Sequence, residues 1–95
     1  MAEYRITYWR EIPSMVTARD GAATSKAALP GRFQEAIDEA AMRQGMAGSD
    51  AYLEQWRHGD WIAADGAPDE VVSAIAQKLD AEYPPQRLDE LVVAP

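Results

Sequence analysis

The sequence predicts an α+β two-layer sandwich, in which a three-stranded, mainly antiparallel sheet carries helices on one face. Near the start of the chain, apolar residues alternate with polar ones, which is typical of a half-buried strand. Two later segments repeat their apolar residues at helical spacing. The 95 residues suffice for one small domain, and the expected order of its elements is β-β-α-α-β-α.

Residues 3–12 are expected to form the first strand, with apolar residues at even positions and polar residues, together with Trp9, at odd positions. Pro13-Ser14 is typical of a turn, so residues 15–19 return as a second strand and Asp20-Gly21 ends this hairpin. The small residues over 21–29 are expected to form a connector that could include a helical turn around Thr24 to Ala28.

The next element is a helix that begins at Pro30, where a missing N–H costs nothing in the first turn. Glu39 and Arg43 stand at i, i+4 spacing on its polar side, which favours an ion pair. Gly45 and Gly48 end the helix. Five apolar residues make its buried stripe: Phe33, Ala36, Ile37, Ala40 and Ala41.

Two short elements follow. Ser49-Asp50 is a good N-cap for a short helix that holds Tyr52, Leu53 and Trp56 and stops at His58-Gly59. The apolar run over residues 61–64 predicts the third strand.

A last helix begins near Pro68, and Pro84-Pro85 terminates it. Its expected buried stripe is Val72, Ile75, Ala76, Leu79 and Tyr83. We therefore predict a single domain over residues 1–83 and a C-terminal tail over residues 84–95. Four apolar side chains of that tail could dock on the body: Leu88, Leu91, Val92 and Val93.

The charge is unevenly distributed. Five basic and three acidic residues give residues 1–32 a charge of +2, whereas four basic and thirteen acidic residues give residues 33–95 a charge of −9. Nucleic-acid binders carry a dense basic stripe, so we expect neither nucleic acid nor an anionic membrane as a partner. No apolar run approaches the ~20 residues of a membrane span, and the first residues resemble no signal peptide. We expect a soluble, cytoplasmic, acidic protein.

Few residues suggest chemistry. The chain has no cysteine, which excludes disulfides and thiolate metal sites, and its serines stand in no nucleophile motif. A metal site could use His58 with Asp60 and Asp65, but we favour the interpretation that His58 caps the short helix. The glycines form no phosphate-binding pattern. We therefore expect no cofactor, no metal and no enzymatic activity of the chain acting alone.

Trp9 is the most informative aromatic residue. It stands at an odd position with Arg5, so it would be exposed if helices cover only the even face of the sheet. Exposed Trp and Arg side chains are the residues most often found at interaction hot spots. The alternative is that the C-terminal tail covers Trp9. Trp56 and Trp61 are expected to complete the core.

Three segments resemble the small bacterial "virulence factor" domain family, the domain also found in conserved virulence factor C. They are YWREIP (residues 8–13), LPGRFQEAID (29–38) and GSDAYLE (48–54), within a likeness that runs from about Tyr4 to Tyr83. The resemblance implies a stand-alone cytoplasmic domain with an interaction role, and it supplies no catalytic residues. The matching residues that the core does not need are candidates for a shared functional surface: Trp9, Arg10, Arg32, Gln34 and Glu35.

We predict an accessory interaction protein that docks on a larger enzyme or assembly through the Trp9 face of the sheet. The alternative is a protein or enzyme subunit that binds a small anionic metabolite, with Arg10 and Arg32 clamping a carboxylate or phosphate. That alternative requires both arginines to converge in one concave pocket. A third alternative is a homodimer formed through the open sheet.

Overall fold

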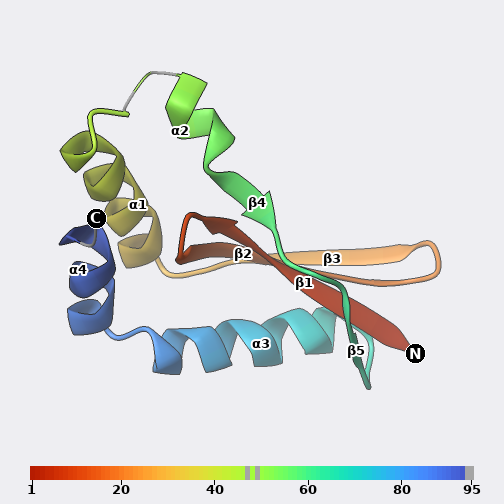
Figure 1. Ribbon diagram of the computed structural model, residues 1–95. Coiled ribbons are helices and arrows are strands. Elements are labelled where there is room, and N and C mark those ends of the chain that lie inside the picture. The colour runs from red at the N-terminus through yellow and green to blue at the C-terminus, as the bar shows by residue number, and fades with distance from the viewer. Residues whose placement is uncertain (47, 49, 94–95) are drawn as a thin grey trace.

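The computed structural model describes residues 1–46, 48 and 50–93 and has an α+β fold (Figure 1). The class is therefore confirmed, but the described residues form five strands and not three. The strands are β1 (Ala2–Trp9), β2 (Ile12–Asp20), β3 (Ala23–Ala28), β4 (Trp56–His58) and β5 (Ile62–Ala64). The helices are α1 (Gly31–Arg43), α2 (Asp50–Glu54), α3 (Pro68–Glu82) and α4 (Pro85–Val93).

β1 is the central strand of an antiparallel sheet with the order β3-β2-β1-β4. Its second edge is shared by two short strands. β4 pairs with the end of β1 around Tyr8, and β5 pairs with the beginning of β1 around Glu3. Between them, the Gly59 N–H donates a hydrogen bond to the Ile6 carbonyl over 2.8 Å. A Cβ at Gly59 would lie 3.3 Å from that carbonyl oxygen, so this position favours glycine.

The first hairpin turns earlier than predicted. Trp9 pairs with Ile12, so Arg10 and Glu11 alone form the turn, and Pro13 lies inside β2. The register shifts beside Tyr8, where Ser14 is the extra residue of a β-bulge. The predicted turn at Pro13-Ser14 is wrong. Pro13 has no backbone N–H to donate to the sheet, but it lies beside the bulge, where a strand tolerates proline.

Two further segments are strands where the sequence predicted otherwise. The expected helical turn around Thr24 to Ala28 is strand β3, which follows a tight turn at Gly21 (φ 61°) and pairs along β2. Trp56 belongs to β4 and not to the short helix, because α2 ends at Glu54 and the chain then pairs with β1. In both cases sheet pairing outweighs the local preference. The predicted N-cap, Ser49, lies outside the described residues.

The two long helices are confirmed. All five residues of the predicted α1 stripe are buried, and the Arg43 Nε lies 3.5 Å from the Glu39 carboxylate. α3 begins at Pro68 and ends just before Tyr83. Of its predicted stripe, Val72 and Leu79 are buried and the other members are partly buried. In the part of the chain that the structure describes, no helix combines the length and the apolar composition that crossing a bilayer requires.

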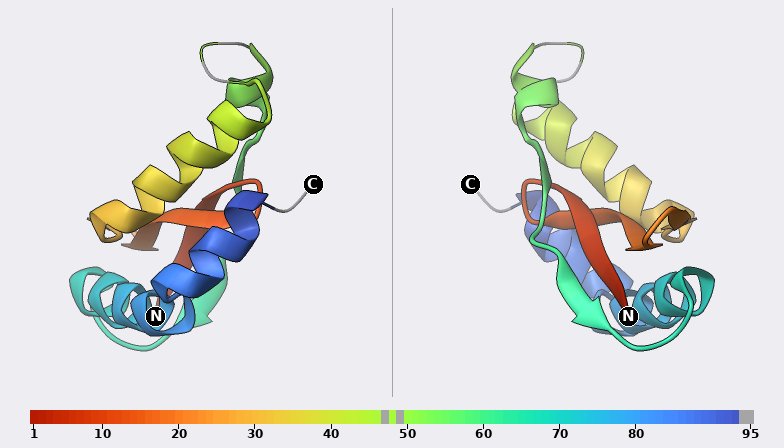
Figure 2. Two further views of the ribbon diagram at one scale, coloured as in Figure 1. Left: turned by 90° about the vertical axis from the view of Figure 1, so that its left-hand side faces the viewer. Right: turned by 90° about the vertical axis from the view of Figure 1, so that its right-hand side faces the viewer.

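The helices do not all lie on one face of the sheet. α3 packs across β1, β2 and β3 on the face that buries Val16 and Ala18 (Figures 1 and 2). α1, α2 and α4 cover the end of the opposite face, where Trp9 and Ile12 are buried. The rest of that face carries no described helix, and we call it the open face. By the register of the strands it comprises Glu3, Arg5, Thr7, Met15, Thr17, Arg19, Thr24, Lys26, Ala28, His58 and Ala63. Trp61 lies against the arginines of this face.

Most of the segment predicted as a tail is helix α4, which packs against α1. Leu88 and Val92 are buried, as the docking prediction states, and Leu91 packs partly against the core. Val93 is 61% exposed. α4 therefore contributes side chains to the same hydrophobic core as the helices before it.

We expect Leu88→Ala to lower the free energy of unfolding by about 2–5 kcal/mol, because it opens a cavity in this core. Val93→Ala, on the same helix but exposed, should change that free energy by less than about 0.5 kcal/mol. Urea denaturation of both variants measures the difference. Equal stability of the two variants would show that α4 is dispensable to the fold.

Candidate functional site

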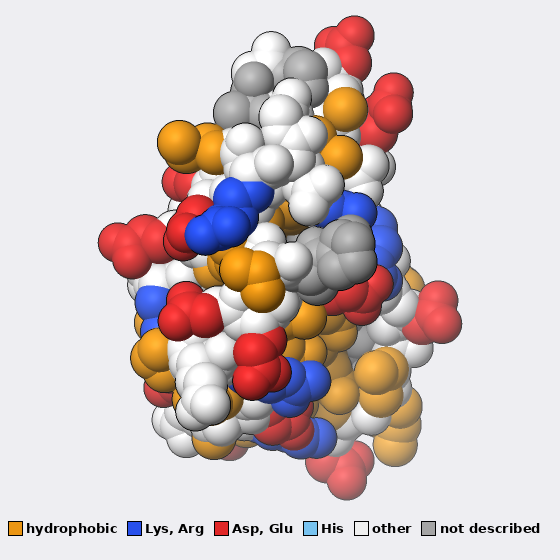
Figure 3. Space-filling view, turned by 60° about the vertical axis from the view of Figure 1, so that its left-hand side comes forward, with side chains coloured by type: hydrophobic (Ala, Val, Ile, Leu, Met, Phe, Trp, Pro, Cys, Tyr) orange, Lys and Arg blue, Asp and Glu red, His pale blue; other side chains and the backbone are white. Residues whose placement is uncertain are grey.

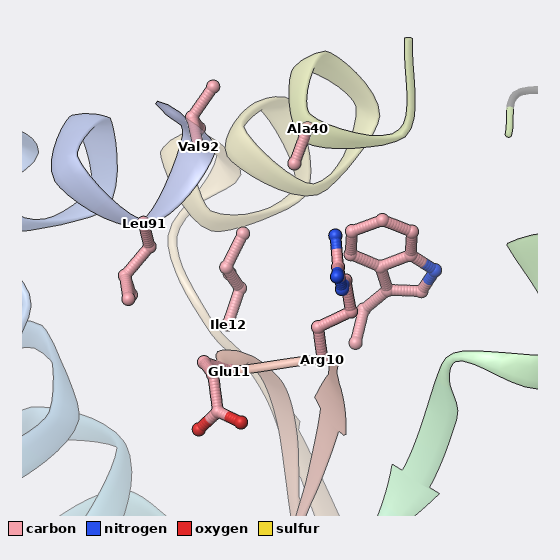
Figure 4. A pocket seen from close by; sticks show the side chains of 7 residues that line it. Arg10, Glu11, Ile12, Ala40, Leu91 and Val92 are labelled. Atoms are coloured by element: carbon pink, nitrogen blue, oxygen red, sulfur yellow. The ribbon is translucent and has the colours of Figure 1, made fainter. Parts of the chain in front are cut away.

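Trp9, predicted as an exposed interaction residue, is fully buried at 0% exposure. Its indole N–H donates to the Tyr52 carbonyl over 2.9 Å, and the rings of these two residues lie 5.7 Å apart. Leu91 and Val92 of α4 line the same hollow as Trp9 (Figure 4). The exposed-Trp9 prediction is wrong because helices close this end of the sheet on both faces.

Arg10 occupies the hairpin turn in a left-handed conformation (φ 54°), which costs a side-chain-bearing residue about 1–2 kcal/mol. The turn is held from both sides. The Arg10 N–H donates to the Gln55 carbonyl over 3.0 Å, and the Arg10 carbonyl accepts from the Arg57 Nε over 3.1 Å. The Arg10 guanidinium carbon lies 6.0 Å from the centre of the Trp9 ring.

A hollow of about 150 Å³ lies beside this turn (Figure 4). It is mostly apolar, with Arg10 and Glu11 as its charged members. Ligand pockets commonly measure ~300–1,000 Å³, so this hollow is smaller than a typical metabolite site. Its lining residues are Trp9, Arg10, Glu11, Ile12, Ala40, Leu91 and Val92.

Arg32 has a structural role at the junction of α1 and α3. Its Nη2 donates to the Asp80 carbonyl over 2.9 Å, to the Asp80 carboxylate over 2.5 Å and to the Tyr83 carbonyl over 3.0 Å. The last carbonyls of a helix have no partner within it, so a cation placed there stabilises the helix end. Arg32 lines a different hollow from Arg10. The structure therefore does not form the predicted two-arginine clamp.

Gln34 and Glu35 are exposed on α1. The Gln34 side-chain amide donates to the Asp38 carboxylate over 2.9 Å, one turn along the same helix. Glu35 lines the shallow hollow that contains Arg32. The five predicted site residues thus lie in the core, at a turn and on a helix, and they form no single surface.

The open face of the sheet carries a different tryptophan between two arginines. The Arg19 guanidinium carbon lies 3.7 Å from the centre of the Trp61 ring, and that of Arg5 lies 4.6 Å from it. The Glu3 carboxylate accepts a 2.7 Å hydrogen bond from Arg19 Nε. We call Arg5, Trp61 and Arg19 the Arg–Trp–Arg stack. The prediction that Trp61 completes the core is wrong, whereas Trp56 does pack partly against the core.

Arg5 has unused hydrogen-bonding capacity. Its Nε is buried and has no partner, and Arg5 makes no hydrogen bond or ion pair with any residue that the structure describes. A buried donor without a partner costs about 1–3 kcal/mol. Because this nitrogen is buried, a partner on this face would meet the terminal nitrogens of the guanidinium and not Nε.

The alternation of residues 3–12 predicts part of this stack, because it places Arg5 on the same face as the other odd positions. The odd positions of β1 that drew attention to Trp9 also include Arg5. Ala63 pairs with Glu3, so Trp61, two residues earlier, falls on the same face. The missing information was that residues 62–64 pair with β1, and no local sequence pattern specifies which strand they join.

His58 caps no helix, because it lies in β4, where its Nδ1 is 3.0 Å from the Thr7 hydroxyl. The described residues contain no group of three side chains that could hold a metal ion. Nearby, the Arg57 guanidinium carbon lies 4.5 Å from the centre of the Tyr8 ring. Burial raises the pKa of the Tyr8 phenol above its ordinary value, so Tyr8 stays neutral at physiological pH.

A protein-family model described as "Virulence factor" matches residues 7–92. The match covers α4 except for its last residue, so it extends beyond Tyr83, where the resemblance seen in the sequence ends. No curated protein and no solved structure matches the chain.

Trp9→Ala should lower the free energy of unfolding by about 3–5 kcal/mol, because it removes the largest fully buried side chain. Trp61→Ala should cost less, about 1–2 kcal/mol, since the half-buried ring is outside the core and loses two contacts with arginine, each worth about 0.5–1 kcal/mol. Chemical denaturation of the pair checks this. A larger loss for Trp61→Ala than for Trp9→Ala would contradict the burial described above.

Arg10→Gly should raise the free energy of unfolding by up to about 1 kcal/mol, because glycine adopts a positive φ without strain. Arg10→Ala keeps the strain and should give no such gain. Thermal unfolding of the two variants measures the difference. If the glycine variant is the less stable one, the Arg10 side chain contributes more to the fold than its backbone strain costs.

Proposed function

The chain belongs to the virulence factor family, and we propose that it is an interaction domain that docks on a larger enzyme or assembly through its open face. The Arg–Trp–Arg stack is the observation that carries this proposal. Tryptophan and arginine dominate interaction hot spots, because each buries a large area and can also form polar contacts.

The geometry of the stack supports this function. Each guanidinium carbon lies within 5 Å of the centre of the Trp61 ring, so the three side chains hold one another in place before any partner arrives. Restricting a side chain on binding costs about 0.5–1.5 kcal/mol, and a preorganised group avoids much of that loss. Unlike Trp9, the stack lies outside the core, so it is free to serve another purpose.

A metabolite-binding function has weaker support. The hollow beside Arg10 is small, and Arg32 already donates to three acceptors of its own chain. The two arginines of that alternative line separate hollows. A protein partner that meets the open face needs neither a deep pocket nor a second arginine from α1.

A pull-down from the native cell tests the proposal, with the wild-type chain and the Arg5→Ala/Trp61→Ala variant as baits. A matched control is Arg43→Ala/Leu53→Ala, which removes one exposed arginine and one exposed apolar side chain from α1 and α2. We expect a partner that wild type and control capture and the open-face variant loses, while the melting temperatures of the variants differ by only a few degrees.

Retention of the partner by the folded open-face variant would contradict the proposal, and so would the absence of any specific partner. Light scattering of the purified wild-type chain shows whether the partner is a second copy of it. A homodimer disrupted by the open-face variant would replace the larger assembly as the proposed partner.

A further inference from the structure

We propose that the open face binds an acidic polypeptide segment of the partner protein, an inference that rests on the docking function proposed above. Charge complementarity carries it. The open face has three cations, Arg5, Arg19 and Lys26, and one carboxylate, Glu3. Its formal charge is thus +2 in a chain whose formal net charge is −7, which leaves −9 for all other residues.

The side of the molecule that carries α1 and α4 lacks this polarity. Figure 3 looks onto the side that carries α1 and α4 and shows acidic side chains beside basic ones. Several of those basic groups are already paired, such as Arg43 with Glu39 and Arg32 with Asp80. On that side a negatively charged segment would meet carboxylates beside the basic groups, whereas the open face has one carboxylate among its three cations.

The register of the sheet determines how the cations are spread. Arg5 pairs with Thr17, and Thr17 pairs with Lys26, so these three residues form one row across β1, β2 and β3. Neighbouring strands lie about 4.8 Å apart, which separates the Arg5 and Lys26 backbones by roughly 10 Å. Arg19 stands in the adjacent row. Cations spread over this width suit a chain segment with several carboxylates better than one small anion.

The guanidinium groups have free donors for carboxylates. Glu3 engages the Nε of Arg19, and Arg5 has no hydrogen-bond partner among the described residues. Contact with the Trp61 ring orients both guanidinium groups, and a guanidinium can donate two parallel hydrogen bonds to one carboxylate. The hydroxyls of Thr17 and Thr24 lie in the same rows and can donate to the carbonyls of a bound segment.

A peptide fits this face better than a nucleic acid does. Nucleic-acid affinity at physiological salt comes from neutralising many phosphates, and proteins that bind this way commonly make 6–10 such contacts. The open face offers three cations, and a strand of nucleic acid that extends beyond it meets a surface of charge −9. A short acidic segment of a folded partner meets only the cations.

The test titrates the full chain into a fluorescein-labelled peptide of twelve residues in which Glu and Gly alternate, with fluorescence anisotropy as the readout. The reference probes are the corresponding Gln-Gly peptide and a labelled single-stranded oligonucleotide of twelve thymidines. We expect the Glu-Gly peptide to bind at least about tenfold more tightly than either reference. Raising the salt from 0.1 to 1 M should weaken its binding strongly, since the screening length falls from about 10 to about 3 Å.

Arg5→Gln/Arg19→Gln should weaken binding of the Glu-Gly peptide by about tenfold or more. The control Arg43→Gln/Lys78→Gln removes the same charge from exposed positions on α1 and α3 and should leave the affinity within about twofold. Circular dichroism establishes that each variant is folded. If the double arginine variant does not fold, Lys26→Gln, a single exposed substitution on β3, takes its place with a severalfold loss expected.

The outcomes separate this inference from the proposed function. Equal losses in the open-face and control variants overturn the inference, because binding then follows net charge alone. Tighter binding of the oligonucleotide overturns it in favour of a nucleic acid. If the Glu-Gly peptide does not bind but the open-face variant still loses its partner in the pull-down, the inference fails and the docking function stands. If neither binding is seen, both fail.

Discussion

The structure depends on the pairing of β1 along both of its edges. β2 satisfies one edge through a two-residue hairpin, and residues from 56 to 64 return across the chain to satisfy the other. A central strand has its side chains divided between two faces of the sheet. Its even positions therefore face α3. The odd positions of β1 include both a core residue, Trp9, and the residues of the open face.

The helices are joined to this sheet and to one another by a few directed contacts. Trp9 donates a hydrogen bond to the α2 backbone, so the largest fully buried side chain also has its polar atom satisfied. Arg32 connects the start of α1 with the end of α3. α4 then packs beside α1 and buries Leu88 and Val92. Substitutions at these positions are expected to lower the free energy of unfolding. Trp9 and Arg32, which both lie in the family segments, are for that reason poor candidates for partner contact.

The open face combines features that a purely structural surface does not require. Its tryptophan lies against two arginines, and its charge is opposite to that of the chain as a whole. The aromatic ring orients the cations, and the sheet register sets their spacing. These properties together favour recognition of an acidic segment over capture of a small anion, for which neither hollow beside Arg10 or Arg32 supplies a suitable site.

The sequence by itself determined the α+β class, both long helices, the buried stripe of α1 and the family. Apolar periodicity is contained within about a dozen consecutive residues, so it predicts a helix without knowledge of which other segments the helix packs against. Only the tertiary structure decided that residues 23–28 and 56–58 are strands, that residues 85–93 are helical, that Trp9 is buried and that Trp61 lies outside the core. These outcomes depend on which distant segment reaches the free edge of β1, since backbone hydrogen bonds form between any two strands and leave no mark in either sequence.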